Sequence, residues 1–309
     1  MSRHQNIQIL LSSYNGEKYI REQLDSFIHL DCYDRAKVLI RDDGSTDSTP
    51  SILKEYADKY GFGVLYGSNK GINASYGLLF KAADLSCDYF AFADQDDVWL
   101  PNKLSRGIQL LSSINVADIP LLYGSRVEIV DENLRHLGYS PIYKKGASFY
   151  NAVIQNILPG HTMILNRTLF KKILDIPTDH DIITDWLIYM IGSGIGHTVY
   201  DDAIGVMHRQ HGNNAIGFEQ QFLKNTLKRI KRFNKGKVNQ NSVQIKAFYE
   251  KYSDLLPEHY RQEIGQYLNS LQNIFKRTLY ATACKAYRQT AFENLLFKVL
   301  YILGKYNLK

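Results

Sequence analysis

Short apolar runs alternate with helix-favouring segments through the first hundred residues, and this alternation restricts the fold more than any other feature of the sequence. Continuous apolar strands separated by amphipathic helices are typical of a mostly parallel sheet that is covered by helices on both faces. We therefore expect an α/β protein with a Rossmann-like sheet. The strands are predicted over 7–13, 37–43, 63–68 and 88–94, and the helices between them over 17–28, 49–60 and 73–84.

The alternation of apolar runs and helix-favouring segments becomes less regular after Pro101. Towards the C-terminus it changes again, to a basic helix followed by helices rich in Tyr and Leu. We therefore expect a catalytic domain over 1–217 and a basic, amphipathic helical region over 218–309. Between Pro101 and the boundary we predict a helix at 102–114, a strand at 120–130, a looped region through Gly146, a strand at 160–166, a helix at 180–192 and two edge strands within 196–214.

Size and cysteine content narrow the class of protein. A chain of 309 residues can bury a sizeable core. The three cysteines are odd in number and far apart in the sequence, which favours neither a disulfide framework nor a zinc site and fits a reducing cytoplasm. The N-terminus does not resemble a signal peptide, and no stretch reaches the roughly 20 apolar residues of a membrane span.

Two C-terminal segments can each be interpreted in two ways. Between Gln220 and Tyr249 there are eight basic residues and no acidic one. This segment is either a solvated helix face or a surface for anionic lipid or a phosphorylated partner. The apolar segment 294–306 is too short to span a membrane. It either packs on the catalytic domain or lies in a membrane interface, which would place the protein at the inner face of the plasma membrane.

Polar clusters follow three of the predicted strands, at 12–19, 41–49 and 94–97. Ligands of open α/β sheets bind beyond the carboxyl ends of the strands, so the three clusters are expected to share one crevice. Asp47 is interpreted as a helix cap, and Thr49 as a second capping residue of the helix that follows. If 94–97 is extended, Asp94 and Asp96 project the same way and could bind one Mg²⁺ or Mn²⁺ ion that carries a diphosphate.

Six stretches of this sequence together resemble the family 2 inverting glycosyltransferases of GT-A fold, and the bacterial rhamnosyltransferase-like subgroup in particular. The resemblance covers roughly 5–215, and the motifs follow one another in the order and spacing of the family. The stretches are LLSSYNGEKYIREQLDSF, IRDDGSTDST, NKGINASYG, FADQDDVWLPNKL, TDWLIYM and HRQHGNN.

The resemblance implies a nucleotide-sugar site. Ser12 and Tyr14 would line the base pocket, and Asp43, beside Asp42, would accept from the N3–H of uracil or thymine. The segment with Asn69 and Gly71 would run past the donor. The positions implied for the nucleotide sugar are Ser12, Tyr14, Asn15, Asp42, Asp43, Asn69, Gly71, Asp94, Gln95, Asp97 and Arg209.

The resemblance also implies a Mn²⁺ or Mg²⁺ site. Asp96 would be the principal ligand and Asp94 a further contact to metal or ribose, while Asp97 would lie behind them or face the sugar. His211 matches a histidine that often completes this site, but His208 is also available. Arg209 could contact the diphosphate or form a structural ion pair. The metal ligands are thus predicted to be Asp94, Asp96 and His211.

Asp185 matches the family's catalytic base. Taken alone, an N-cap or solvent-facing residue of the helix is the favoured interpretation of Asp185, and the resemblance makes the catalytic base the better one. As a base it would take the proton from an acceptor hydroxyl that attacks the anomeric carbon, which inverts the configuration. The metal would stabilise the departing diphosphate.

These inferences predict a transferase that uses a UDP- or dTDP-sugar. The acceptor would be a hydroxyl of a bacterial surface glycan or lipid-linked saccharide, and rhamnose is one candidate sugar. A sugar nucleotidyltransferase is the alternative, but the first polar cluster lacks the expected Gly-rich basic loop. A non-enzymatic basic module that binds nucleic acid is disfavoured by the acidic crevice. A two-carboxylate glycoside hydrolase would need neither nucleotide nor metal.

Overall fold

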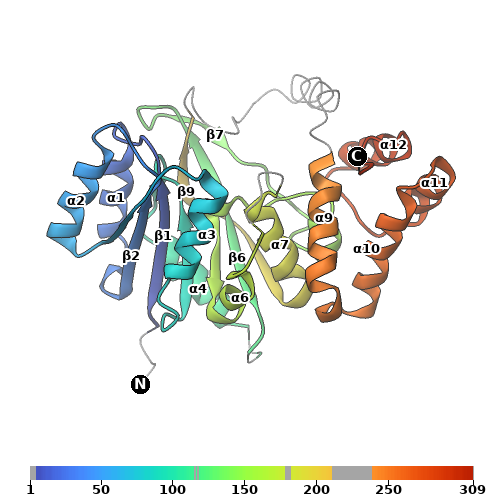
Figure 1. The fold of residues 1–309 in the computed structure, drawn as a ribbon, viewed down its shortest axis with the longest axis horizontal. Helices are drawn as coiled ribbons and strands as arrows, with labels where there is room; N and C mark the ends of the chain where they lie inside the picture. The colour runs from blue at the N-terminus through green and yellow to red at the C-terminus, as the bar shows by residue number, and fades with distance from the viewer. Residues whose placement is uncertain (1–4, 115, 117, 178–181, 211–238, 309) are drawn as a thin grey trace.

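The computed structural model describes residues 5–114, 116, 118–177, 182–210 and 239–308 (Figure 1). Nine strands of these residues form one sheet. The strands are β1 (Ile7–Ser13), β2 (Ala36–Asp42), β3 (Gly63–Tyr66), β4 (Tyr89–Ala93), β5 (Val98–Trp99), β6 (Leu121–Val130), β7 (His136–Tyr139), β8 (Ile164–Asn166) and β9 (His197–Arg209).

Helices surround the sheet and continue beyond it at the C-terminal end. Three short 3₁₀ turns lie between them, at Tyr33–Arg35, Gly160–Thr162 and Ser253–Leu255. The helices are α1 (Ile20–Ile28), α2 (Thr49–Tyr60), α3 (Ile72–Ala82), α4 (Lys103–Ser112), α5 (Phe149–Ala152), α6 (Arg167–Ile173), α7 (Thr184–Ile195), α9 (Asn239–Tyr252), α10 (Glu258–Ser270), α11 (Ile274–Ala283) and α12 (Ala291–Ile302).

The strand order is β3-β2-β1-β4-β8-β6-β9-β5, with β7 paired to β6. The first four strands of this order are parallel, as the alternating pattern predicts. The short strand β8 runs antiparallel to both β4 and β6, whereas β6 and β9 are parallel to each other. The carboxyl ends of β1, β2 and β4 therefore lie side by side at one edge.

Alternate residues of the central strands pack into two separate cores, because successive side chains of a strand point to opposite faces. In β1, Ile9 and Leu11 face the core that includes α1, α2 and α4, whereas Leu10 faces the core that includes α3, α6 and α7. All seven residues of β1 are buried. Burial on both faces explains why the strand appears in the sequence as a continuous apolar run.

The helix over 49–60 is confirmed at both ends, and its sequence explains why it starts and stops there. Pro50 lies in the first turn, where its missing N–H has no partner to lose. Gly61 ends the helix in the left-handed conformation, with φ of 72°. The predicted cap at Thr49 is wrong: Ser48 is the capping position, and the Thr49 hydroxyl instead accepts a hydrogen bond from Gly16 N at 2.8 Å.

The expectation of two edge strands within 196–214 is also wrong. Residues 197–209 form the single strand β9, which pairs with β6 on one side and with β5 on the other. Register shifts near Arg126 let the long strand bend while keeping its partner. The predicted strand at 160–166 is a 3₁₀ turn followed by the three residues of β8.

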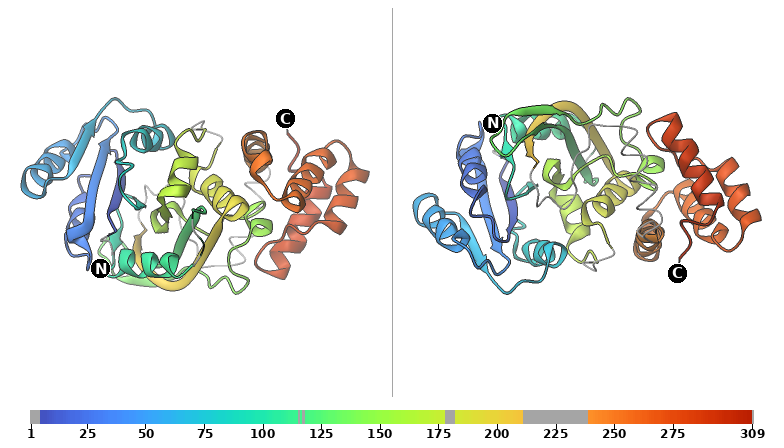
Figure 2. Two further views of the ribbon diagram at one scale, coloured as in Figure 1. Left: turned by 90° about the horizontal axis from the view of Figure 1, so that it is seen from below. Right: turned by 90° about the horizontal axis from the view of Figure 1, so that it is seen from above.

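The C-terminal helices continue the core on the face of α7. Phe248 of α9 lies 5.9 Å from Phe149, measured between ring centroids, and both belong to the core that contains α7. Helices α10, α11 and α12 extend this packing away from the sheet (Figure 2). The predicted boundary at 217–218 lies outside the described residues. No helix in the described ranges is long and apolar enough to cross a membrane.

Candidate active site

The polar clusters that follow β1, β2 and β4 meet at one edge of the sheet. Ser13 pairs with Asp42 across β1 and β2, and Leu11 pairs with Ala93 across β1 and β4. The loops that begin at Tyr14, Asp43 and Asp94 therefore start next to one another. The three polar clusters that were expected to share one crevice are therefore neighbours at this end of the sheet.

The Tyr14 loop is held by the side chain of Gln95. Tyr14 N donates to Gln95 Oε1 at 2.9 Å, and Gln95 Nε2 donates to Tyr14 O at 3.1 Å. A Cβ atom on Gly16 would lie 2.4 Å from Gln95 Oε1 and would displace the Gln95 amide from Tyr14. The backbone of the loop is thus fixed while the Tyr14 side chain stays 46% exposed. An exposed ring on a fixed loop is suited to stack on a planar ligand.

Asn15 and Asp47 join the Tyr14 loop to the loop after β2. Asn15 adopts a left-handed conformation, with φ of 47°, and its Oδ1 accepts from Thr46 N at 2.8 Å. Asp47 precedes Ser48, the capping position of α2; its Oδ1 accepts from Thr49 N at 2.9 Å, and its Oδ2 accepts from Glu17 N at 3.1 Å. The two loops therefore form one rigid unit.

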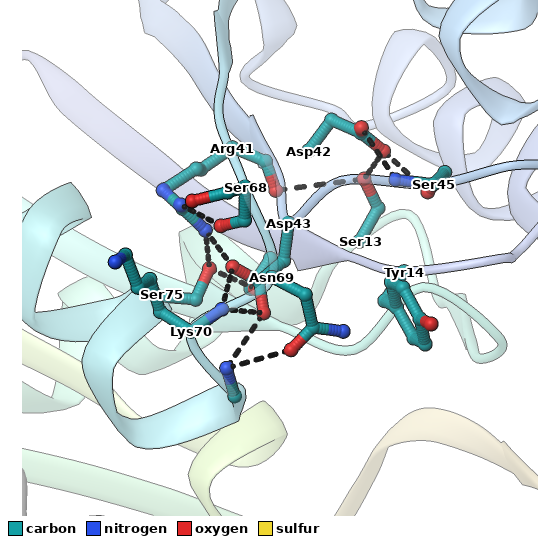
Figure 3. A network of polar contacts seen from close by, with 12 residues as sticks. Ser13, Tyr14, Arg41, Asp42, Asp43, Ser45, Ser68, Asn69, Lys70 and Ser75 are labelled. Carbon is teal, nitrogen blue, oxygen red and sulfur yellow. Dashed lines mark hydrogen bonds and ion pairs between the residues drawn. The ribbon is translucent and has the colours of Figure 1, made fainter.

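Asp43 is the centre of a buried network (Figure 3). Its carboxylate accepts from Lys70 N at 2.9 Å and from Gly71 N at 2.9 Å, and it pairs with the Arg41 guanidinium. Arg41 also donates to Ser75 Oγ at 2.9 Å and to Ser68 O at 3.1 Å. Asp43 thereby fixes the 68–71 segment beneath the crevice.

The other residues predicted for the nucleotide-sugar site in this region are positioned by local hydrogen bonds. Asp42 is buried and accepts from Ser45 N at 3.0 Å and from Ser45 Oγ at 2.5 Å. Ser12 Oγ lies 2.5 Å from Ser75 Oγ, inside the sheet edge. Asn69 Oδ1 accepts from Gly71 N at 3.1 Å, and Gly71, with φ of 82°, starts α3.

The acidic segment 94–97 is a turn between β4 and β5 rather than an extended strand. The expectation that Asp94 and Asp96 project alike from an extended chain is therefore wrong. The Asp94 side chain is 42% exposed, whereas that of Asp97 is fully buried. The turn leaves one carboxylate partly exposed to solvent and directs another into the protein.

Two histidines lie among these carboxylates. His161 Nδ1 is 3.1 Å from Asp94 Oδ2 and 3.8 Å from Asp97 Oδ2, and His208 Nδ1 is 2.8 Å from Asp97 Oδ1. The two imidazole rings stack at 4.8 Å with 5° between their planes. Burial alone would lower the pKa of His161, but Asp97 and Asp94 outweigh it and raise that pKa to about 9. At neutral pH His161 is therefore protonated between two carboxylates, and it would have to lose this proton to ligate a metal.

Asp97, His161 and His208 form a group that could bind a metal, because one ligand atom of each lies within 4.8 Å of the others. Two buried atoms of the group, Asp97 Oδ2 and His161 Nε2, have no hydrogen-bond partner in the described part of the chain. A mixed set of oxygen and nitrogen donors suits Mn²⁺ better than Mg²⁺. Sequence reasoning missed His161, although the Pro159–Gly160 pair before it signals a turn.

Asp185 lies in the first turn of α7 and faces the turn that carries His161. Its Oδ1 accepts from Trp186 N at 2.7 Å, and its Oδ2 accepts from Gly160 N at 3.1 Å. Burial raises the pKa of this carboxyl despite these two bonds. Gly160 and His161 are adjacent, so one short turn contacts both Asp185 and Asp94.

Arg209 and His211 are the remaining residues predicted for the site. The buried Arg209 guanidinium donates to Asp96 O at 2.9 Å and pairs with Glu22, and it lies 4.6 Å from the Tyr19 ring centroid. It therefore supports the acidic turn from inside the protein. His211 lies outside the described residues.

The parallel strands, the turn of carboxylates beyond β4 and the carboxylate at the start of α7 define a glycosyltransferase of the GT-A class. The family model described as Glycosyl transferase family 2 matches residues 8–174, and the chain belongs to that family.

Several known proteins resemble this chain over most of its length. The dTDP-rhamnosyl transferase RfbG of Shigella flexneri is 30% identical over 278 residues, which cover 84% of each chain. The crystal structure of residues 1–349 of TarS from S. aureus matches with a TM-score of 0.59 and 17% identity, over 98% of this chain and 89% of that one. The mannosyltransferase PcManGT of Pyrobaculum calidifontis, in complex with GDP-Man and Mn²⁺, matches with a TM-score of 0.52 and 15% identity, over 98% and 86%. The structural matches support the GT-A fold.

Proposed function

We propose that this glycosyltransferase moves a sugar from a UDP- or dTDP-sugar to an acceptor hydroxyl, with inversion and with the help of a divalent metal. One observation carries the proposal. The turn Gly160–Thr162 contacts Asp185 through Gly160 N and Asp94 through His161 Nδ1, at 3.1 Å in each case. A proton acceptor and a carboxylate of the acidic turn are thus fixed relative to each other.

The pyrimidine of the donor would lie between the Tyr14 ring and the network of Asp43. A carboxylate offers about four acceptor positions. Asp43 receives three donors, from Arg41, Lys70 and Gly71. Lys70 N contacts both oxygens, Oδ1 at 2.9 Å and Oδ2 at 3.1 Å. The N3–H of uracil or thymine would take the place of the longer of these two contacts, and a cytosine or purine base would not supply this donor in the same place. A relative named dTDP-rhamnosyl transferase and a structure of TarS with UDP-GlcNAc support such donors.

The metal would be Mn²⁺ or Mg²⁺. Asp94 and Asp96 are the proposed carboxylate ligands at the crevice, with His211 as a third. A second group of possible ligands lies next to Asp94 and consists of Asp97, His161 and His208. This group would either offset the charge of the Asp94 carboxylate or supply further ligand atoms. Bound there, the metal would stabilise the negative charge of the departing diphosphate.

Asp185 is the proposed general base. Its raised pKa makes it a better proton acceptor than an ordinary aspartate. The bonds from Gly160 N and Trp186 N hold the carboxylate in one orientation. The acceptor oxygen would lose its proton to Asp185 as it attacks the anomeric carbon from the side opposite the nucleotide.

The acceptor is proposed to be a hydroxyl of a bacterial surface glycan or of a lipid-linked saccharide. The three cysteines are all free, which fits a reaction in the cytoplasm. A lipid-linked acceptor would bring the enzyme to the inner face of the plasma membrane.

The first test is a donor-hydrolysis screen of UDP- and dTDP-sugars with Mn²⁺, in which the released nucleoside diphosphate is measured. We expect release from at least one donor, loss of release in excess chelator and recovery when Mn²⁺ is returned. Unchanged release in chelator would contradict the metal role. No release from any donor would contradict the donor class.

The second test is Asp185→Asn. We expect this variant to bind the donor with unchanged affinity and to lose transfer by about 10²- to 10⁴-fold. Asp202→Asn, which alters an exposed carboxylate of β9, is the matched control and should transfer normally. A loss of donor affinity in Asp185→Asn would contradict its assignment as the base.

A further inference from the structure

Helices α11 and α12 each carry large, exposed apolar side chains, which together we call the α11–α12 surface. On α12 the exposed residues recur every three or four positions, so they form a stripe along one side of the helix. Exposure is high for single side chains: 84% for Phe275, 71% for Leu279, 63% for Leu295 and 61% for Leu303. The surface consists of Phe275, Leu279, Phe292, Leu295, Val299 and Leu303.

These side chains are not exposed because the helices lack a buried core of their own. Phe297 and Tyr301 of α12 are almost fully buried, and they lie on the opposite side of the helix from the exposed stripe. Tyr280 and Ala281 of α11 are buried in the same way. Each helix has therefore already buried one apolar face, and the second apolar face remains at the surface.

The charge of the chain is distributed unevenly in a way that fits an anionic partner. Residues 1–219 contain 20 basic and 26 acidic residues, whereas residues 220–309 contain 17 basic and 5 acidic ones. The formal net charges are −6 and +12, so the C-terminal part alone makes the chain basic. Exposed Lys276 and Lys305 and half-buried Lys298 lie on or beside α11 and α12.

We propose that the α11–α12 surface docks on an anionic lipid membrane. Apolar side chains would enter the interface between head groups and acyl chains, and the surrounding lysines would lie against the phosphates. A second copy of the chain fits this surface less well, because residues 274–305 contain six basic residues and one acidic one, and two such regions would repel each other. The helices lie in the interface and do not span, in line with their length and composition.

This surface lies far from the edge of the sheet that forms the candidate site. Figure 1 shows α11 and α12 at one end of the molecule, with α1, α2 and β2 at the other. Membrane contact would therefore leave the nucleotide-binding loops free. The inference is independent of the proposed function, because membrane binding needs neither donor nor acceptor.

Co-sedimentation of the full chain with vesicles tests the proposal. We expect binding to vesicles of equal parts phosphatidylglycerol and phosphatidylcholine, and little binding to phosphatidylcholine alone. Leu295→Ser with Leu303→Ser should lower the partition coefficient about tenfold or more. Replacing Lys276, Lys298 and Lys305 by Gln should lower it by a similar factor and remove the dependence on anionic lipid.

The matched control replaces exposed apolar residues elsewhere, with Leu85→Ser and Leu137→Ser. This variant should bind vesicles like the unaltered chain. Phe275→Ser with Leu279→Ser gives a second apolar variant on α11 in case the α12 variant does not fold, as judged by circular dichroism and donor hydrolysis. Failure of the unaltered chain to bind anionic vesicles would overturn the proposal. So would a dimer in light scattering that the Leu295 and Leu303 changes abolish, since a second copy would then cover the surface.

Discussion

His161 Nδ1 lies 3.1 Å from Asp94 Oδ2, and its ring stacks on that of His208, which in turn contacts Asp97. The cluster of carboxylates after β4 therefore contains a cation that the protein itself provides. Like charges at this spacing repel one another, and an imidazolium between them offsets the repulsion. The acidic turn can keep its shape in this way before any ligand arrives.

We expect His161→Phe to impair transfer, because phenylalanine keeps a ring that can stack on His208 but cannot donate to Asp94. Loss of a partner that orients a ligand of a metal site commonly lowers activity by about 10- to 100-fold. His161→Asn should recover most of the activity, since its amide nitrogen can reach the place of Nδ1. The measurement is the transfer rate at saturating donor, with a titration of Mn²⁺. Equal losses in the two variants would show that the hydrogen bond to Asp94 has no role.

Gly160→Ala should displace the proposed base slightly. A Cβ atom at Gly160 would lie 3.3 Å from Asp185 Cβ, which is closer than such contacts usually come. We expect kcat to fall by about tenfold with little change in the donor KM, because geometry at the base matters after the donor is bound. Gly265→Ala in α10 is the matched control, since a Cβ atom there makes only an ordinary contact with Tyr249. A change in donor KM without a change in kcat would contradict the prediction.

The pH dependence of transfer should report Asp185. A base must be deprotonated to act, so the rate should fall as the pH drops through the pKa of Asp185. Burial raises that pKa, and the fall should therefore begin at a higher pH than an ordinary aspartate would cause. The measurement is kcat against pH at saturating donor and acceptor. An acidic limb at the pKa of an exposed aspartate would argue that Asp185 is solvated or is not the base.

The sequence predicts most of the sheet edge because its signals are local. Strands β1, β2 and β4 are buried on both faces, so each appears as an apolar run with boundaries correct to within one residue. The two-residue strand β5 and the hairpin partner β7 have no comparable run and were not predicted. Strand β9 was divided in two because its inner and outer residues alternate irregularly around the register shifts with β6.

The candidate site is less predictable because its key contacts are distant in the sequence. Gln95 binds the backbone of Tyr14 across 81 positions, and His161 reaches Asp94 across 67. A motif identifies Gln95 and Asp94 as important but does not show that one of them fixes a loop. His161 stands outside every motif, and only the return of β8 beside β4 brings it to the acidic turn.

Lys103 should destabilise the fold, and its replacement by Met should stabilise it. This lysine is the first residue of α4 and is 1% exposed, and its Nζ has no hydrogen-bond partner among the described residues. The ammonium lies 3.6 Å from the centroid of the Trp99 ring, which compensates only in part for the lost water.

Burial lowers the pKa of Lys103 to about 7, although Asp97 acts in the opposite direction. In the unfolded chain the ordinary pKa is about 10.4, so between pH 7 and 10 the unfolded state binds a proton that the folded state does not. The stability contributed by this group therefore rises with pH across that window and is lowest below pH 7. We expect Lys103→Met to raise the free energy of unfolding most at pH 6, and the gain to shrink by about 1.4 kcal/mol for each pH unit between pH 7 and pH 10. Urea unfolding of both proteins across this range measures the difference, with Lys81→Met on the exposed side of α3 as the control that should show no such trend. A Met variant that is less stable at every pH would show that the ammonium is paired in the folded protein.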